Sequence, residues 1–264
     1  MKQPESHRRP LGRLPGLLAI VLVALPTALW SQDALPSGEQ IRESYVRALG
    51  GAEALQSPKS SHVTGTFEIP AQGITGHMEM FGAAPNKLFT KMEMPGAGLV
   101  TTGYDGEVAW TISPMMGPML IEGPTLRQLQ QQADFYSVLF PERYIESFET
   151  VTSKDFEGKP CYEVRVVTNW GEEYSEYYEV ATGLQAGTVR TQESPMGPIE
   201  ATIVVSEYGK FGAILVPTKI VQRAMGMTQV MTILSVEYDT VADSVFAIPP
   251  EIKALLEPAP SGKL

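Results

Sequence analysis

The chain has 264 residues, of which 43% are hydrophobic and 19% charged, and its formal net charge is −10. A protein this acidic repels the phosphates of nucleic acids and of anionic lipids, which excludes binding to either through bulk charge. The only cysteine, Cys161, excludes an internal disulfide framework. Because Cys161 lies within a run of alternating polarity, we expect it to be a small packing residue rather than a reactive thiol.

The first 31 residues have the pattern of a secretory signal peptide. Basic residues precede an apolar stretch at 14–30, which two prolines interrupt, and its unbroken core is too short to span a bilayer. We therefore expect residues 1–31 to be removed near Ser31 or Gln32, which gives a periplasmic protein without a stable membrane anchor. An uncleaved N-terminal anchor is the alternative. No cysteine directly follows the apolar stretch, so lipid attachment is not expected.

Two amphipathic helices are predicted in the exported part. Residues 37–55 begin with Ser37 and Gln40 at the spacing of a capping box and are broken by a glycine pair. Residues 125–134 form the second helix, which Thr125 and Gln128 are expected to cap in the same way. Its apolar stripe is narrow, so we expect this helix to pack less tightly than a core helix.

The rest of the chain consists of short alternating runs separated by turn residues. Four or five such runs lie between residues 63 and 112, and seven more lie between 148 and 238. This spacing predicts a mainly β protein with a few helices, built on a barrel-like or half-barrel antiparallel sheet of about eleven strands. Residues 114–123 are predicted to be an irregular loop, residues 258–264 a disordered tail, and residues 32–257 a single domain.

Methionines occupy alternate positions in the runs between residues 77 and 114. Because side chains of a strand alternate between its two faces, we expect one face of this meander to be apolar and the other polar. The apolar face is predicted to carry Met78, Met80, Met92, Met94, Trp110 and Ile112. Methionine is flexible and polarizable, so such a face accommodates ligands of variable shape. Ordinary core filling is the alternative, and copper(I) binding is disfavoured because no His or Cys is near these methionine pairs.

The same region resembles a known protein family. Pro85-Asn86-Lys87-Leu88-Phe89, followed by Tyr104-Asp105-Gly106, Trp110 and a closing Pro114, is similar to the motif order of periplasmic outer-membrane lipoprotein carriers and sorting proteins, the LolA- and LolB-like proteins. The resemblance extends over about half of the exported chain. It implies an unclosed, strongly curved half-barrel whose concave apolar face is covered by helices and binds acyl chains. Ala84 stands where these carriers have an arginine that holds the helical lid closed, so their latch is not implied here.

No pattern of residues points to catalysis. Only His62 and His77 remain after the signal peptide, without metal-ligand spacing, and no nucleophile elbow or phosphate loop is present. We therefore expect neither an enzyme nor a cofactor, and a hydrolase with an unrecognised site is the weakest alternative. The acidic stretch 172–179 is predicted to be a solvated strand edge rather than a pair of catalytic carboxylates.

These observations together predict a soluble periplasmic carrier or binding protein for a lipoprotein, a lipid or another lipophilic molecule. The apolar cavity is expected to include Met116 and Met119 from the loop and Leu126 and Leu129 from the second helix, with residues 114–123 forming its mouth. The alternative is a non-enzymatic envelope module, an interaction or sensor domain that binds a protein partner. In either case we expect a monomer with at most transient envelope partners and no nucleic acid.

Overall fold

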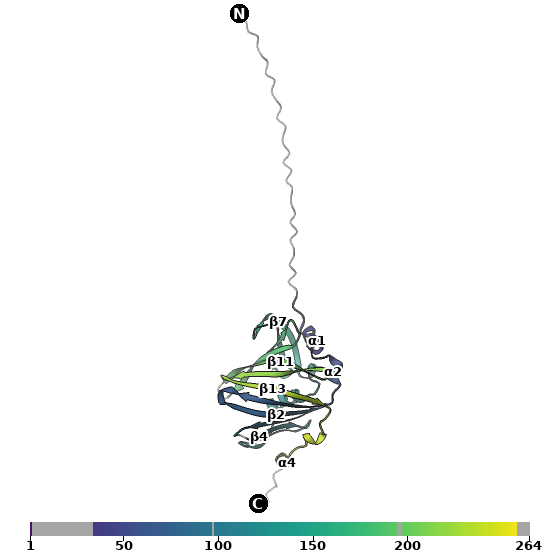
Figure 1. The fold of residues 1–264 in the computed structure, drawn as a ribbon, viewed down its shortest axis with the longest axis vertical. Helices are drawn as coiled ribbons and strands as arrows, with labels where there is room; N and C mark the ends of the chain where they lie inside the picture. Colours follow the sequence, from purple (N-terminus) through teal and green to yellow (C-terminus); the bar gives the residue numbers. More distant parts are fainter. Residues whose placement is uncertain (2–33, 97, 195–196, 258–264) are drawn as a thin grey trace, which may run out of the picture. The chain divides into compact units, whose positions relative to one another are not determined.

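The computed structural model describes Met1 and residues 34–257, except residues 97 and 195–196. The predicted signal peptide and the predicted C-terminal tail therefore lie outside the described residues. The described residues from Leu35 onward form one compact unit. This unit is mainly β, and it carries short helices at its N-terminus, in the middle of the sequence and near its C-terminus (Figure 1).

Thirteen strands form one antiparallel sheet in the order β6-β5-β4-β3-β2-β1-β13-β12-β11-β10-β9-β8-β7. The strands are β1 (Ser60–Ile69), β2 (Ile74–Ala83), β3 (Lys87–Met94), β4 (Gly98–Tyr104), β5 (Ala109–Ser113), β6 (Gly117–Leu120), β7 (Ile145–Phe156), β8 (Lys159–Thr168), β9 (Glu173–Glu179), β10 (Gln185–Ser194), β11 (Gly197–Phe211), β12 (Ile214–Ala224) and β13 (Met227–Tyr238). Within β1 to β6 and within β7 to β13 each strand pairs with its neighbour in sequence, and the pairing of β1 with β13 joins the two halves. The sheet stays open, with β6 and β7 at its edges, and it forms an unclosed half-barrel (Figure 1).

The predicted fold class is confirmed, but the strand count is higher than the expected eleven. The structure has a strand, β6, within residues 114–123, where an irregular loop was predicted. Ser113 is opposite Gly117 and Trp110 is opposite Leu120, so β6 continues the meander after a turn at 114–116. The two prolines of this segment suggested a loop, but Pro118 lies on an edge strand, where a missing N–H donor is tolerated.

The helices are α1 (Gly38–Ala48), α2 (Ala52–Gln56), α3 (Gly123–Ala133) and α4 (Pro250–Leu256), with short 3₁₀ turns η1 (Pro70–Gln72), η2 (Pro141–Arg143) and η3 (Asp243–Phe246). The capping box of α1 is confirmed, because the Gln40 N–H donates to Ser37 Oγ and the Ser37 N–H donates to Gln40 Oε1. The cap predicted for the second helix is wrong. Helix α3 begins at Gly123 without a side-chain cap, since Pro124 in its first turn needs no hydrogen-bond partner for its nitrogen.

Helices α1 and α3 pack on the same face of the sheet, which we call the inner face. Ile41 of α1 packs against Val166 of β8, and Leu129 of α3 packs against Leu88 of β3. Directly opposed residues in successive strands lie on one face, and following these pairs from β8 to β3 places both helices on that face. The predicted helical cover of the concave face is therefore confirmed.

Candidate ligand-binding face and cavity

Four of the predicted ligand-binding methionines lie together on the inner face. Met78 of β2 is directly opposite Met92 of β3, and Met80 and Met94 follow at the same parity on these strands. Met78 is 9% exposed, whereas the other three are half-buried. They pack in one cluster with Phe67 and with Met231 of the adjoining strands β1 and β13.

Trp110 and Ile112 lie on the opposite, outer face, so their predicted place beside the methionines is wrong. On β3 the inner-face residue Met92 is opposite Val100, whereas the outer-face residue Phe89 is opposite Gly103. Gly103 in turn is opposite Trp110, so Trp110 lies on the outer face. The loop between β4 and β5 contains an even number of residues, 105–108. After an even-length loop, odd-numbered residues occupy the face that even-numbered residues occupied before it. Trp110 is nevertheless fully buried, with its ring against Gly103, where any side chain would collide with it.

Residues 114–123, which were predicted to form the mouth of the cavity, do not line the cavity that the structure contains. Met116 belongs to the hairpin turn between β5 and β6 and is 66% exposed. Met119 is opposite Thr111 and therefore lies on the inner face, half-buried at the edge strand β6. Neither residue lines the cavity described below.

Leu126 and Leu129 hold α3 on the inner face. Leu129 is 8% exposed and Leu126 is half-buried, and both pack around Leu88, Tyr104 and Ala109. They therefore contribute to the core between α3 and the strands β3, β4 and β5. The sequence predicted that both leucines line the ligand cavity, but they pack against the strands instead and do not line the cavity described below.

The two helices are too small to cover the whole inner face. Thirteen strands spaced about 4.8 Å apart extend over roughly 60 Å around the sheet. Each helix has 11 residues, about 16 Å in length, and is about 10 Å wide. The strands between them consequently carry apolar side chains that are only half-buried. These are Met80, Met92, Met231 and Ile220.

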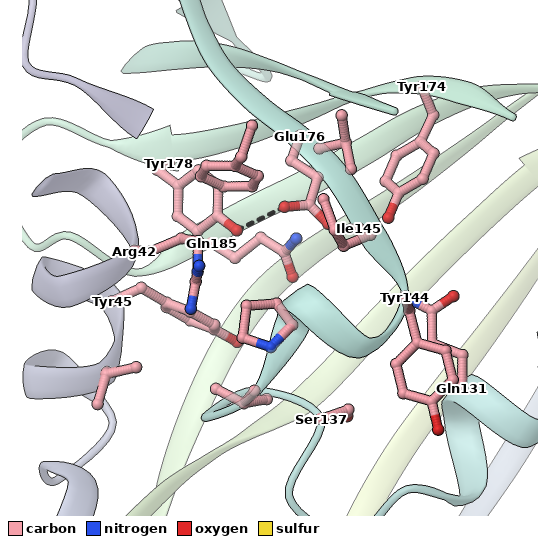
Figure 2. A pocket seen from close by; sticks show the side chains of 15 residues that line it. Arg42, Tyr45, Gln131, Ser137, Tyr144, Ile145, Tyr174, Glu176, Tyr178 and Gln185 are labelled. Carbon is pink, nitrogen blue, oxygen red and sulfur yellow. Dashed lines mark hydrogen bonds between the residues drawn. The ribbon is translucent and has the colours of Figure 1, made fainter. Parts of the chain in front are cut away.

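A cavity of about 180 Å³ lies on the inner face beneath α1. Its walls come from α1, from the end of α3, from the segment 137–148 and from strands β8, β9 and β10 (Figure 2). The polar lining residues are Arg42, Tyr45, Gln131, Ser137, Tyr144, Tyr174, Glu176, Tyr178 and Gln185, and the apolar ones are Val46, Val138, Pro141, Ile145, Phe148 and Val166. None of these residues was expected from the sequence to bind a ligand.

Glu176 of β9 supplies the carboxyl group of this cavity. The Tyr178 hydroxyl donates a hydrogen bond to Glu176 Oε2 at 2.5 Å (Figure 2). Burial raises the pKa of the Glu176 carboxyl, although the hydrogen bond from Tyr178 and the positive charge of Arg190 act in the opposite direction. Burial likewise raises the pKa of Tyr178 well above the usual tyrosine range, so its hydroxyl remains a donor at neutral pH.

The acidic stretch 172–179 is thus not a solvated strand edge, and that prediction is wrong. Strand β9 lies between β8 and β10 in the interior of the sheet. Tyr174, Tyr177 and Tyr178 are buried, and the tyrosines on either side of Glu176 at the same parity share its cavity. This alternation of tyrosine and glutamate was the signal in the sequence that points to an inward-facing carboxyl group.

Arg42 brings a positive charge to the same cavity from α1. Its guanidinium carbon lies 6.0 Å from the centre of the Phe148 ring, in a cation–π arrangement. Arg42 and Glu176 both line the cavity, yet no ion pair joins them among the described residues. The cavity therefore presents two opposite charges on separate walls.

The remaining residues singled out from the sequence have structural surroundings. His77 is exposed, and His62 stacks on Phe81 with a ring-centre distance of 4.3 Å. Cys161 is fully buried against Phe156 and Tyr177, consistent with a packing residue. Within residues 34–257, as far as they are described, no cluster of His, Cys, Asp and Glu is arranged to hold a metal ion. No helix in this part of the chain is long and apolar enough to cross a membrane.

Comparison with known proteins identifies the fold. No family model and no curated protein matches the sequence. Among solved structures, a DUF1329 family protein from Desulfovibrio piger aligns with a TM-score of 0.55 at 11% identity, over 79% of this chain and 96% of that one. A LolA superfamily protein from Nitrosomonas europaea aligns with a TM-score of 0.55 at 11% identity, over 81% and 99%. A putative outer membrane lipoprotein-sorting protein domain from Vibrio parahaemolyticus gives 0.49 at 9% identity, over 79% and 97%.

The first two alignments show a LolA-like fold. The fold implied by the motif resemblance at residues 85–114 is therefore confirmed. At this level of identity the likeness concerns the fold alone, and the ligand has to be argued from the inner face itself.

Proposed function

We propose that this protein is an exported, periplasmic binding protein or carrier for a lipophilic molecule, whose apolar part lies against the inner face. The observation that carries the proposal is the incomplete cover of that face. Met80, Met92 and Met231 are half-buried between the two helices, where a closed core would bury them completely. An apolar surface of this kind is what a ligand with hydrocarbon chains covers.

The expected driving force is the removal of apolar surface from water. Each methylene group that becomes buried contributes about 0.8 kcal/mol, so a chain of several methylenes gains several kcal/mol. Methionine side chains adapt to chains of different length and saturation because they are unbranched and flexible. The motif resemblance to lipoprotein carriers supports the same ligand class. Ala84, which replaces their latch arginine, leaves the transfer of lipoproteins in particular outside the proposal.

A fluorescent acyl probe tests the proposal with a matched pair of substitutions. Met92→Gln introduces an amide of similar shape on the half-buried inner face, and Met116→Gln makes the same change at an exposed turn. Burying an amide without a partner costs about 1–3 kcal/mol, so Met92→Gln should weaken probe binding about 5- to 150-fold. Met116→Gln should leave it unchanged. Equal affinities of both variants and the unaltered protein would contradict the proposal, provided that thermal unfolding shows that all three are folded.

A second candidate function is an envelope module that binds a protein partner. Three hairpins at one end of the sheet carry exposed apolar side chains at or next to their turns: Leu99 of the β3–β4 hairpin, Met115 and Met116 of the β5–β6 hairpin, and Met225 and Met227 of the β12–β13 hairpin. Surface methionines in such number suit a protein contact. Mass spectrometry of protein extracted gently from its host separates the candidates, because co-purified lipid is expected only for the carrier.

A further inference from the structure

We propose that the cavity beneath α1 binds a small zwitterionic group, with the ligand's ammonium at Glu176 and its phosphate or carboxylate at Arg42. This inference rests on the proposed function, because the zwitterion would be the polar end of the same lipophilic ligand. It assigns a role to the polar part of the inner face, which a purely apolar cargo would leave unused.

The cavity holds an acidic and a basic side chain on separate walls. Arg42 reaches the cavity from α1 and Glu176 from β9, and no ion pair joins them (Figure 2). A charge removed from water is strongly unfavourable unless a partner compensates it. A ligand that carries both charges provides a partner for each of them at once, whereas a purely anionic or purely cationic ligand provides only one.

The cavity also has an aromatic lining. Four tyrosines and Phe148 surround the cavity, and tyrosine rings attract ammonium groups through their negatively polarised faces. The four are Tyr45, Tyr144, Tyr174 and Tyr178. The Tyr178 hydroxyl also fixes the Glu176 carboxyl by donating a hydrogen bond to it, which orients the carboxyl before a ligand arrives.

The size of the cavity also suits a small end group. Cavities that enclose a whole drug-sized ligand measure about 300–1,000 Å³, and this one measures about 180 Å³. It is therefore too small for a lipid and large enough for one end group. The cavity also lies on the same face of the sheet as the methionines, so hydrocarbon chains attached to that group have an apolar surface next to them.

Binding of phosphoethanolamine, followed by NMR titration of the exported chain, tests the inference directly. Ethanolamine and inorganic phosphate, which each carry one half of the charge pattern, serve as comparison probes. We expect phosphoethanolamine to bind at least about tenfold more tightly than either. Glu176→Gln and Arg42→Gln should each weaken its binding by about 10- to 100-fold. Glu43→Gln, an exposed change on the same helix, is the matched control and should have no effect.

Several results would overturn the inference. They are the absence of phosphoethanolamine binding, an affinity no higher than that for ethanolamine or phosphate, or an unchanged affinity in Glu176→Gln. Circular dichroism and thermal unfolding establish that the glutamine variants are folded. The acyl-probe assay keeps the two proposals apart. If the probe binds and phosphoethanolamine does not, only the headgroup inference fails. If phosphoethanolamine binds and the probe does not, the carrier proposal fails, and with it the identification of this zwitterion as the end of a lipid.

Discussion

Replacing Gly38 by alanine should destabilise the domain, although alanine is the better helix former. Gly38 lies at the start of α1, and a Cβ atom there would meet the Phe148 carbonyl oxygen closer than 3.0 Å, a separation that Cβ atoms essentially never show. The chain cannot easily move away, because the Thr150 hydroxyl donates a hydrogen bond of 2.6 Å to the Pro36 carbonyl just before the helix.

Two effects with opposite signs decide the magnitude. Helix propensity favours alanine over glycine by about 1 kcal/mol in a helix interior and by less in the first turn. Overpacking against a backbone atom, which has no rotamer to change, costs about 1–3 kcal/mol, and here the upper part of that range applies. We therefore expect a net loss of about 2 kcal/mol. For a domain of this size that corresponds to a decrease of roughly 4–8 °C in Tm.

Differential scanning calorimetry measures this decrease, with Glu43→Ala on the exposed side of α1 as the control. The control should stay within about 0.5 kcal/mol of the unaltered protein. If Gly38→Ala is as stable as the unaltered protein or more stable, helix propensity dominates. The close approach of α1 to β7 would then be refuted, and so would the position of the helix that roofs the cavity.

Three further predictions concern single side chains. Cys161 should not react with a thiol reagent until the protein is denatured, because the side chain is fully buried and burial raises its pKa to about 11; labelling of the native protein would contradict this. Burial raises the pKa of Glu176 in the folded state, so at intermediate pH the folded protein retains a proton that the unfolded chain has already lost. The free energy of unfolding should therefore fall as pH rises from the ordinary glutamate range through the raised pKa. Urea unfolding at several pH values should show this component in the unaltered protein and not in Glu176→Gln. Glu157→Gln should cost less than about 1 kcal/mol despite two hydrogen bonds from Arg223, at 2.8 and 3.0 Å, because the pair is solvent-accessible; a larger loss in the same assay would refute this.

The sign of the Glu176 effect depends on the groups that face its carboxyl. These are Arg42 and Tyr45 from α1, Tyr174 and Tyr178 from β9, and Gln185 and Arg190 from β10. The arginines and the hydrogen bonds favour the ionised carboxylate, but burial is the largest influence and favours the protonated acid. A bound ammonium would reverse this balance, so phosphoethanolamine should reduce the loss of stability at higher pH.

Local features of the fold followed directly from the sequence. The capping box at Ser37, the break after Ala48 and the alternation of the methionine strands each depend on residues within a few positions of one another. Short-range rules describe such features well because the same few residues supply both the pattern and the contacts. The strand spacing predicted a barrel-like or half-barrel sheet, and the motif resemblance implied that it is unclosed and strongly curved. The strand count missed β6 because its proline and glycine are also typical of loops.

The face of Trp110 could not be obtained from the odd or even position of residues alone, because it also depends on the length of each loop. The turns at 95–97 and 114–116 contain three residues each and preserve parity, whereas the loop 105–108 contains four and reverses it. The sequence Asp105-Gly106 correctly indicated a reversal of direction, and the Asp105 side chain accepts hydrogen bonds from two N–H groups of this loop. What the pattern did not include was the effect of an even-length loop on every residue that follows it.

The cavity was missed for a different reason, which lies in long-range pairing. A run of glutamates and tyrosines suits an edge strand when its neighbours are unknown, because charge on an edge prevents aggregation. Strand β9 becomes an interior strand only through its ladders with β8 and β10, and α1 reaches the same face from more than 120 positions earlier in the chain. Neither contact leaves a local signature in the sequence around Glu176.

The inner face thus combines two surfaces that a single ligand class would use together. Half-buried methionines offer an apolar surface that adapts to hydrocarbon chains, and the cavity offers a fixed carboxyl, a guanidinium and a ring of tyrosines. If the face served only as a core, replacing Glu176 by a leucine would remove an unfavourably buried carboxyl group and improve the packing. If it served only hydrocarbon, Arg42 and Glu176 would oppose binding. An amphiphile with a small zwitterionic end is the ligand for which both surfaces contribute favourably.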